Sequence, residues 1–481
     1  MIDKKERKIV LTPSQQQAFD KLKRFVNSGI TNTFILTGYA GTGKTTLMKT
    51  LIEWMDTEEK HFQILASTGR AAKILSNKTE CPALTVHSCI YTFDDFNQDI
   101  EKVVKKIDEA KGIDKTGQLL LQFKPVSANN LDYNRKFYIV DESSMISDSI
   151  EPNPTQAIFG TGKLLSDLIK FDEKGYFIFL GDACQLPPIS QNFSPALDKE
   201  YLEEVHHLCV EQATLNEIVR QKDGNDIILA AARMRSLYQN PPKVKWGKFP
   251  LRGYKDIEIH PNQLSIVNAY INNVKQNGFN AATLLCGSNL ACNILTKIVR
   301  PSLGFNSPTL SENELLLITQ NNGPTGLMNG DLVKVISTGH RKRRAGLTFL
   351  YVEVEEMVNK QTFSLLLIED ILYGNKINLT QENQKALFID FYRRMKEQNI
   401  KPKTDTFKKA MQDDPFLNAL RAVYGYALTC HKAQGGEWND VYLDIPRYLS
   451  HSPKRSTYQW LYTAMTRASN RLHVADDFFI T

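Results

Sequence analysis

The sequence has few of the features that mark membrane, exported or disulfide-stapled proteins. No uncharged apolar stretch approaches twenty residues, and the first eight residues are mostly charged, with no apolar signal segment after them. Its seven cysteines are odd in number and form no C-x-x-C pair, which argues against a disulfide framework. We therefore expect a cytoplasmic protein that does not bind membranes.

Charge of one sign and clustered metal ligands are also scarce. The 59 lysines and arginines only slightly exceed the 53 aspartates and glutamates, so a polyanionic partner is permitted but not required. No nuclease-type cluster of carboxylates is apparent, which disfavours intrinsic DNA cleavage. The run at 206–209, His-His-Leu-Cys, lacks a second ligand cluster, and we interpret it as structural. A length of 481 residues with 42% hydrophobic residues predicts two to four globular domains.

Residues 38–45, Gly-Tyr-Ala-Gly-Thr-Gly-Lys-Thr, match the phosphate-binding pattern G-x-x-x-x-G-K-[ST] without a mismatch. The apolar run at 34–36 predicts a buried strand before this loop, and a helix is expected to begin at Lys44. Phosphates bind at the positive end of such a helix. Lys44 is then expected to reach the β- and γ-phosphates, and the Thr45 hydroxyl to hold a magnesium ion.

Two later strands are expected to end in polar side chains at the same sheet edge. The run 137–140 leads directly into Asp141 and Glu142. In enzymes with a phosphate loop, the first carboxylate anchors the magnesium shell and the second can activate the attacking water. The run 176–180 leads toward Gln185, which can contact the γ-phosphate and report its loss. A structural ion pair is the alternative for the two carboxylates.

Three further segments of the first half suggest binding roles. Gln15 begins a helix, and its amide can pair with both N6 and N7 of adenine, although a solvent-facing glutamine is the alternative. Residues 67–73 follow a predicted strand at 62–66 and resemble a second strand-to-helix anion site, suited to a nucleic-acid phosphate. Residues 85–88 follow a similar pattern, although an isolated histidine such as His87 is more often structural.

The second half predicts another α/β unit, from about residue 210, without a second phosphate loop. Short strands with polar turns suggest a small β-barrel inserted into this unit, at 332–337, 347–353 and 362–368. The basic run 340–344 is expected in a turn, as a solvated loop or as a phosphate contact. A helix with an apolar stripe is expected after a cap at Thr380.

A predicted helix at 460–468 carries Arg467. A hydrolase whose phosphate loop lies in one unit needs a cation to stabilise the charge that spreads onto the γ-phosphate. An arginine from a facing unit supplies it only when the cleft closes. The sequence therefore predicts that cleft closure and hydrolysis depend on each other.

These motifs follow one another in the order found in superfamily 1 DNA helicases. They are Gln15 in its context and residues 38–45, 67–73, 141–145, 181–189, 215–221, 426–437 and 461–468. Gly-Asp-x-x-Gln-Leu-Pro-Pro and His-Lys-x-Gln-Gly-x-Glu within them resemble the RecD, Dda and Pif-like branch. The resemblance implies two RecA-like domains with ATP and Mg²⁺ between them, single-stranded DNA across their tops, and 5′-to-3′ translocation.

The resemblance also implies a role for individual residues. Those expected to bind ATP are Gln15, Gly38, Gly41, Thr42, Gly43, Lys44, Thr45, Thr46, Gly435 and Glu437. Those expected to serve hydrolysis are Lys44, Asp141, Glu142, Gln185, Arg220 and Arg467, with Thr45 and Asp141 on the magnesium ion. Those expected near DNA are Thr68, Arg70, His87, Thr429 and His431.

The predicted fold class is α/β, with two tandem RecA-like domains built on parallel sheets, a small insertion in the first and a β-barrel-like insertion in the second. The first domain is expected at 1–88 and 128–209, and its insertion, a candidate strand-separating wedge with Phe123, at 89–127. The second domain is expected at 210–331 and 416–481, and the barrel at 332–415. The helical stretch 380–409 departs from the family pattern.

The expected partners are single-stranded, duplex and forked DNA, and we expect a monomeric motor, with accessory proteins left open. Two other functions stay open from the sequence. One is a motor subunit of a nuclease or recombination assembly, and the other is a single-strand DNA-binding protein switched by ATP.

Overall fold

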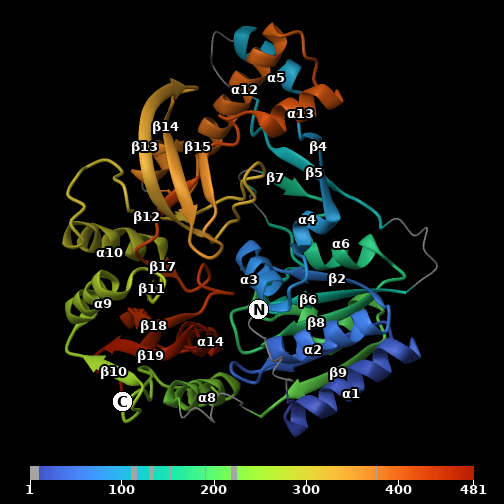
Figure 1. The fold of residues 1–481 in the computed structure, drawn as a ribbon, viewed down its shortest axis with the longest axis vertical. Helices are drawn as coiled ribbons and strands as arrows, with labels where there is room; N and C mark the ends of the chain where they lie inside the picture. Colours follow the sequence, from blue (N-terminus) through green and yellow to red (C-terminus); the bar gives the residue numbers. More distant parts are fainter. Residues whose placement is uncertain are drawn as a thin grey trace, which may run out of the picture.

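The computed structural model describes residues 10–109, 116–128, 135–151, 154, 157–189, 191–217, 225–374 and 376–481. Within these ranges, no helix is long and apolar enough to cross a membrane. Figure 1 shows two α/β units beside each other, a β-sheet unit above the second, and a group of helices at the top.

The first unit is a six-stranded parallel sheet in the order β3-β2-β6-β8-β1-β9. Its central strands are nearly continuous apolar runs because helices cover both faces. The strands are β1 (Thr33–Gly38), β2 (His61–Ala66), β3 (Ala83–Thr85), β6 (Lys136–Asp141), β8 (Tyr176–Gly181) and β9 (Val210–Leu215). The helices are α1 (Pro13–Ser28), α2 (Lys44–Thr57), α3 (Gly69–Thr79), α4 (Val86–Ile90), α6 (Leu164–Phe171) and α7 (Lys199–His206).

Strand β9 corrects the expected start of the second unit at residue 210. It pairs in parallel with β1, with Val210 opposite Thr33 and Leu215 opposite Gly38. Val210 and Leu215 are buried and complete the two cores of the first unit. The strand therefore belongs to the first sheet because its apolar side chains cover that sheet's edge.

The second unit is a five-stranded parallel sheet in the order β10-β19-β18-β11-β17. Its strands are β10 (Ile257–His260), β11 (Ala282–Cys286), β17 (Leu428–Thr429), β18 (Trp438–Leu443) and β19 (Ala468–Ala475). Its helices are α8 (Asp226–Gln239), α9 (Gln263–Asn277), α10 (Asn289–Ser302) and α14 (Arg455–Met465). The two parallel sheets confirm the predicted α/β fold class with two RecA-like domains.

An antiparallel sheet in the order β15-β14-β13-β12-β16 is inserted into the second unit. A bridge between Leu367 and Leu420 joins β15 to the segment before β16, so the sheet curls toward the predicted barrel. Because β12 and β16 take part, the barrel begins earlier and ends later than the expected 332–415. The strands are β12 (Leu315–Ile318), β13 (Leu332–Arg344), β14 (Leu347–Glu356), β15 (Thr362–Ile368) and β16 (Ala422–Tyr424).

The basic run 340–344 is strand, not turn. β13 continues to Arg344, and Ala345 and Gly346 form the turn with φ of 51° and 76°. Arg341 Nε donates to Glu369 Oε2 at 2.7 Å, and Glu369 is buried. Arg341 and Arg344 thus pair with carboxylates of the following helices, and backbone pairing with β14 keeps the run extended.

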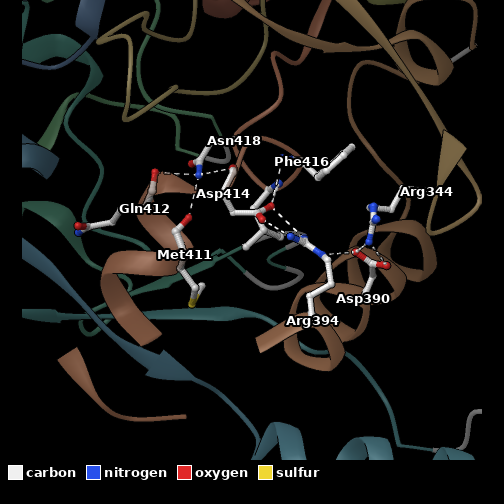
Figure 2. Close-up of polar contacts among 9 residues, drawn as sticks. Arg344, Asp390, Arg394, Met411, Gln412, Asp414, Phe416 and Asn418 are labelled. Carbon is white, nitrogen blue, oxygen red and sulfur yellow. Dashed lines mark hydrogen bonds and ion pairs between the residues drawn. The ribbon is translucent and has the colours of Figure 1, made fainter. Parts of the chain in front are cut away.

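The helical stretch after the barrel consists of α12 (Gln381–Glu397) and α13 (Asp405–Asp413). Thr380 caps α12 as predicted, by accepting a hydrogen bond from Asn383 N. Figure 2 shows the ion pairs that hold α12 and α13 in place. Arg394 binds Asp390 on its own helix and Asp414 just after α13. Asp390 also binds Arg344 of the barrel. Asn418 Nδ2 closes the end of α13 by donating to the carbonyls of Met411, Gln412 and Asp414.

The insertion of the first unit forms a small three-stranded sheet, β4-β5-β7, with a helix at its tip. Strand β7 lies beyond the predicted 89–127 and pairs in parallel with β5. Phe123 on β5 is half-buried, and its ring stacks on Phe159 at 4.7 Å. The aromatic side chain expected at a DNA fork is therefore packed inside the insertion. The elements are β4 (Tyr91–Phe96), α5 (Ile100–Glu109), β5 (Leu121–Pro125) and β7 (Ala157–Phe159).

The insertion and the helical stretch share one apolar core, which we name the bridge core. Phe96 and Phe388 meet within it edge to face, with ring centroids 5.1 Å apart. At its rim, Arg393 Nη2 lies 2.7 Å from Asp108 Oδ1. The two units are therefore joined at the top of the molecule as well as through the chain (Figure 1). The buried members are Phe96, Ile100, Val104, Leu119, Phe388, Phe391, Tyr392, Met395, Phe407 and Met411.

Phe388→Ala is expected to loosen both sides of the bridge core, because truncating a buried phenylalanine costs about 3–5 kcal/mol. Hydrogen exchange in α5 and in α12 should accelerate by at least about tenfold. Phe363→Ala in the barrel is the matched control and should leave α5 unchanged. Acceleration confined to α12 would show that the contact with the insertion contributes no stability.

Candidate active site

The loop at 38–45 joins β1 to α2 in the conformation that the sequence predicts. Gly41 and Gly43 have φ of 79° and 77°, values that side chains with a Cβ rarely adopt. Lys44 begins α2, and its Nζ donates to the carbonyls of Gly38 at 2.6 Å and Tyr39 at 3.1 Å. The ammonium group therefore lies over the loop, at the positive end of the helix. Thr45 is half-buried and Thr46 is exposed on the first turn.

Gln15 is buried, and both ends of its amide are engaged. Its Oε1 accepts from Thr12 N at 2.9 Å, which completes a capping box, and its Nε2 donates to Thr42 O at 3.0 Å. Thr42 is itself buried and its hydroxyl donates to Tyr39 O. In this arrangement Gln15 holds the phosphate loop against α1. The contact between Gln15 and adenine stays a prediction. It requires the Gln15 amide to give up its hydrogen bonds to Thr12 N and Thr42 O in favour of the base.

Asp141 ends β6 and Glu142 follows it in a left-handed conformation, with φ of 50°. A non-glycine residue held there at a strand end is strained. Burial and the neighbouring Glu142 charge raise the pKa of Asp141 above its usual value. A divalent cation beside the carboxylate would favour its ionised form. The oxygen donors of Thr45 and Asp141 are of the kind that Mg²⁺ prefers, so these residues fit the expected ion.

Gln185 lies in a segment of the first unit, residues 181–188, that is held by the second unit. Leu186 N donates to Thr463 Oγ1 at 2.9 Å, and Gln459 Nε2 donates to Gln185 O at 3.3 Å. Both partners lie on α14. Gln185 Oε1 is buried and has no hydrogen-bond partner among the described residues. The side chain is therefore available for the predicted contact with a phosphate or its attacking water.

Tyr462 of α14 joins the two units at the phosphate loop. Its hydroxyl donates to Asp182 Oδ2 at 2.6 Å and accepts from Ala40 N at 2.9 Å. Burial and the Asp182 carboxylate raise the pKa of Tyr462 well above its usual value, so it stays a neutral donor. No sequence pattern points to this residue, because only the fold places it opposite Asp182.

Arg467 is buried at the end of α14. Its guanidinium donates to Thr463 O at 3.0 Å and to Gly436 O at 3.3 Å. The neighbouring Gly435 has φ of 75° and lies so close to α3 that an added Cβ would be 3.1 Å from Ala71. Arg467 is thus held at the interface between the two units, on the side of the second. Glu437 is exposed nearby.

The candidate DNA residues Thr68, Thr429, His431 and His87 differ in their exposure and in their local contacts. Thr68 and Thr429 act as local caps: Thr68 Oγ1 accepts from Ala71 N, and Thr429 Oγ1 accepts from Lys432 N. His431 is exposed. His87, by contrast, is half-buried against Phe159, and burial lowers its pKa to about 4, so it is neutral at physiological pH.

Arg70 lies at the interface between the units. It is buried, and its guanidinium stacks over the Trp438 ring at 4.4 Å. Burial, and less strongly the charge of Arg467, lower the pKa of Arg70 to about 10. DNA contact by Arg70 stays a prediction, and it needs the units to separate locally. Arg220, the other predicted cation, lies outside the described residues.

A second polar junction joins α3 to the barrel. Lys73 Nζ lies 2.9 Å from Asp331 Oδ2 and 3.7 Å from Glu356 Oε1, and both carboxylates are buried. Buried carboxylates need a counter-charge, so separating the units here is costly. No sequence pattern points to these three residues, because they come from elements far apart in the chain.

Two family models match the chain. Residues 10–238 match a model described as AAA domain, and residues 424–475 match a model described as UvrD-like helicase C-terminal domain. The first match includes the phosphate loop and Asp141, and the second includes Arg467.

Two curated relatives are uncharacterized proteins. One, from Methanocaldococcus jannaschii, is 25% identical, with 92% of this chain and 36% of the relative covered. The other, from Acanthamoeba polyphaga mimivirus, is 23% identical, with 95% of this chain and 98% of the relative covered. The chain therefore spans about a third of the first relative's length and nearly all of the second's.

Several solved structures are similar over the whole chain. The Pif1 helicase from Candida albicans is 17% identical with a TM-score of 0.43, and 98% of this chain and 96% of that chain are covered. The Pif1 helicase from Bacteroides, in complex with ADP-AlF3 and ssDNA, is 15% identical with a TM-score of 0.47, with 98% and 93% covered.

Tyr462→Phe is expected to loosen the junction at the phosphate loop, because it leaves the Asp182 carboxylate and the Ala40 N–H without their partner, at about 1–3 kcal/mol. Hydrogen exchange in residues 38–45 should accelerate by roughly tenfold. Tyr458→Phe on the same helix is the matched control, since the buried Tyr458 hydroxyl has no partner among the described residues. Equal behaviour of the two variants would contradict the assignment.

Proposed function

We propose that the chain is a superfamily 1 helicase, in keeping with its matches to an AAA domain and a UvrD-like helicase C-terminal domain. In this proposal it hydrolyses ATP between its two α/β units and uses that cycle to translocate 5′-to-3′ on single-stranded DNA and to separate duplex or forked DNA. The polarity comes from the resemblance to the RecD, Dda and Pif-like branch. The proposed motor acts as a monomer.

The observation that carries this proposal is the meeting of both units at the phosphate loop. The loop and the segment 181–188 come from the first unit, while Tyr462 and Thr463 come from the second. Because side chains of the second unit complete the surroundings of the loop, nucleotide binding there can change how the units meet. Such coupling is what a motor needs.

Each residue of the site has a proposed part in hydrolysis. Lys44 binds the β- and γ-phosphates, Thr45 and Asp141 hold Mg²⁺, and Glu142 orients and deprotonates the attacking water. Bound Mg²⁺ would neutralise developing phosphate charge. Gln185 senses the γ-phosphate, and the cations Arg220 and Arg467 stabilise the transition state.

The insertion is the proposed strand-separating element, held in place by the bridge core. A wedge must resist the load of a moving fork, and packing against α12 and α13 from the other unit stiffens the insertion. Because Phe123 stacks inside the insertion, the contact with the fork is proposed for the insertion as a body, not for that side chain.

The purified chain in a strand-displacement assay tests the function directly. Unwinding of a duplex with a 5′ single-stranded tail, but not of one with a 3′ tail, is the expected result with ATP and Mg²⁺. DNA-stimulated ATP turnover without displacement would favour a motor subunit of a larger assembly. ATP-dependent binding without stimulated turnover would favour a DNA-binding switch.

Two substitutions are expected to fail in different ways. Lys44→Ala should weaken ATP binding and abolish turnover, because it removes the phosphate-binding cation. Glu142→Gln should keep ATP binding and lose turnover, because it removes only the base for the attacking water. Nucleotide binding and single-turnover hydrolysis, each measured with single-stranded DNA, separate the two. Parent-level hydrolysis by Glu142→Gln would overturn its role.

Arg467→Ala is expected to leave ATP affinity within a few-fold while lowering turnover by about a thousandfold, the scale of a transition-state arginine. Arg467→Lys keeps the charge but not the planar fork, so it should restore only part of the rate. Arg447→Ala is the control, since Arg447 is exposed and pairs with Asp477. Loss of affinity at an unchanged maximal rate would make Arg467 a ground-state ligand.

A further inference from the structure

Two histidines and a glutamate converge at the edge of the second sheet, apart from the residues of the proposed ATP site. Glu258 and His260 lie on β10, and His473 lies on the neighbouring β19. Glu258 is directly opposite His473 in the parallel pairing. Because alternate residues of a strand face the same side, all three side chains project from one face of the sheet.

The donor atoms form a compact triangle. His260 Nε2 lies 3.0 Å from His473 Nδ1, Glu258 Oε1 lies 3.6 Å from His260 Nε2, and Glu258 Oε2 lies 3.4 Å from His473 Nδ1. A tetrahedral zinc ion with bonds of about 2.0–2.1 Å sets its ligand atoms about 3.3 Å apart. The triangle therefore already has the size that such an ion imposes.

The surroundings fix the two imidazoles and leave one side open. His473 is buried, and its ring stacks on the Tyr442 ring at 4.1 Å with an interplanar angle of 6°. His260 is half-buried, while Glu258 is exposed, so an ion bound by the three would face solvent. Arg471, whose Nη1 lies 3.8 Å from Glu258 Oε2, competes with a metal for the carboxylate.

A hydrogen bond between the two rings is the simpler account of the 3.0 Å contact. It employs one nitrogen of each ring, His260 Nε2 and His473 Nδ1. It also gives no reason for Glu258 to approach both nitrogens. One ion accepting a lone pair from each of the three side chains accounts for the whole triangle.

We propose that Glu258, His260 and His473 bind one divalent transition-metal ion of the zinc class, with water as the fourth ligand. Two nitrogen donors and one oxygen donor suit Zn²⁺ or Co²⁺ better than Mg²⁺, which separates this site from the proposed nucleotide magnesium. In the ring that donates the hydrogen bond between the imidazoles, the proton moves to the other ring nitrogen, so that each neutral ring offers a lone pair to the ion. The ion would tie the edge strand β10 to β19.

Titration of the chelator-treated full-length chain with Co²⁺, in excess Mg²⁺ to occupy oxygen-only sites, tests the proposal. We expect one Co²⁺ per chain with the intense visible absorption of tetrahedral coordination, displaced by Zn²⁺. His260→Gln and Glu258→Gln should each weaken binding by more than about tenfold. His340→Gln is the matched control, because His340 is exposed on the barrel. His473 is left intact because its burial makes a folding defect the first expectation.

A folded parent chain that binds no Co²⁺, or binds it only with the weak absorption of octahedral coordination, overturns the proposal. Equal affinity in the parent, His260→Gln and Glu258→Gln also overturns it, by placing the ion elsewhere. Thermal unfolding with and without Zn²⁺ gives a second measurement: the melting temperature should rise in the parent and in His340→Gln, and less in the two site variants. Circular dichroism checks that all variants are folded.

Discussion

The buried carboxylate of Asp182 constrains how the two units can meet. A buried charge is stable only when hydrogen bonds satisfy it, and the donors of Asp182 come from both units: Cys184 N and the Tyr462 hydroxyl. The same hydroxyl accepts from Ala40 N in the phosphate loop. Any motion that withdraws α14 therefore changes both the segment 181–188 and the loop. The geometry of the phosphate site cannot be independent of the distance between the units.

The bridge core adds a second constraint far from the first. The insertion of the first unit and the helices after the barrel share the buried side chains of the bridge core, and the network around Arg394 and Asp390 fixes those helices to the barrel (Figures 1 and 2). The ion pair between Lys73 and Asp331 forms a third contact between the two units. A relative rotation of the units must therefore strain one of these junctions or bend the barrel attachment, since packed interfaces do not deform continuously.

Local patterns predicted the parts of the site that lie within one strand and the turn after it. The glycines of 38–45 and the carboxylates after β6 are where the sequence places them, because strand, turn and helix signals are short-range. Contacts between distant segments were not predictable in this way. β9 resembles the opening strand of the second unit, and only its pairing with β1 places it in the first. Tyr462 carries no sequence signal, because its role depends on α14 facing Asp182. The run at 340–344 looks like a solvated turn until Glu369 is seen to pair with Arg341.

The triangle of Glu258, His260 and His473 is a further contact between distant segments that sequence patterns do not predict. Metal sites are recognised in sequences by ligands at short fixed spacings, whereas 213 positions separate the two histidines here. Their approach follows from the strand order, which puts the last long strand of the chain beside an edge strand formed early in the second unit. An edge strand has one neighbour, so backbone hydrogen bonds attach it to the sheet on one side only. Side-chain contacts across that pair, whether a hydrogen bond or a shared ion, therefore reinforce the single attachment of β10.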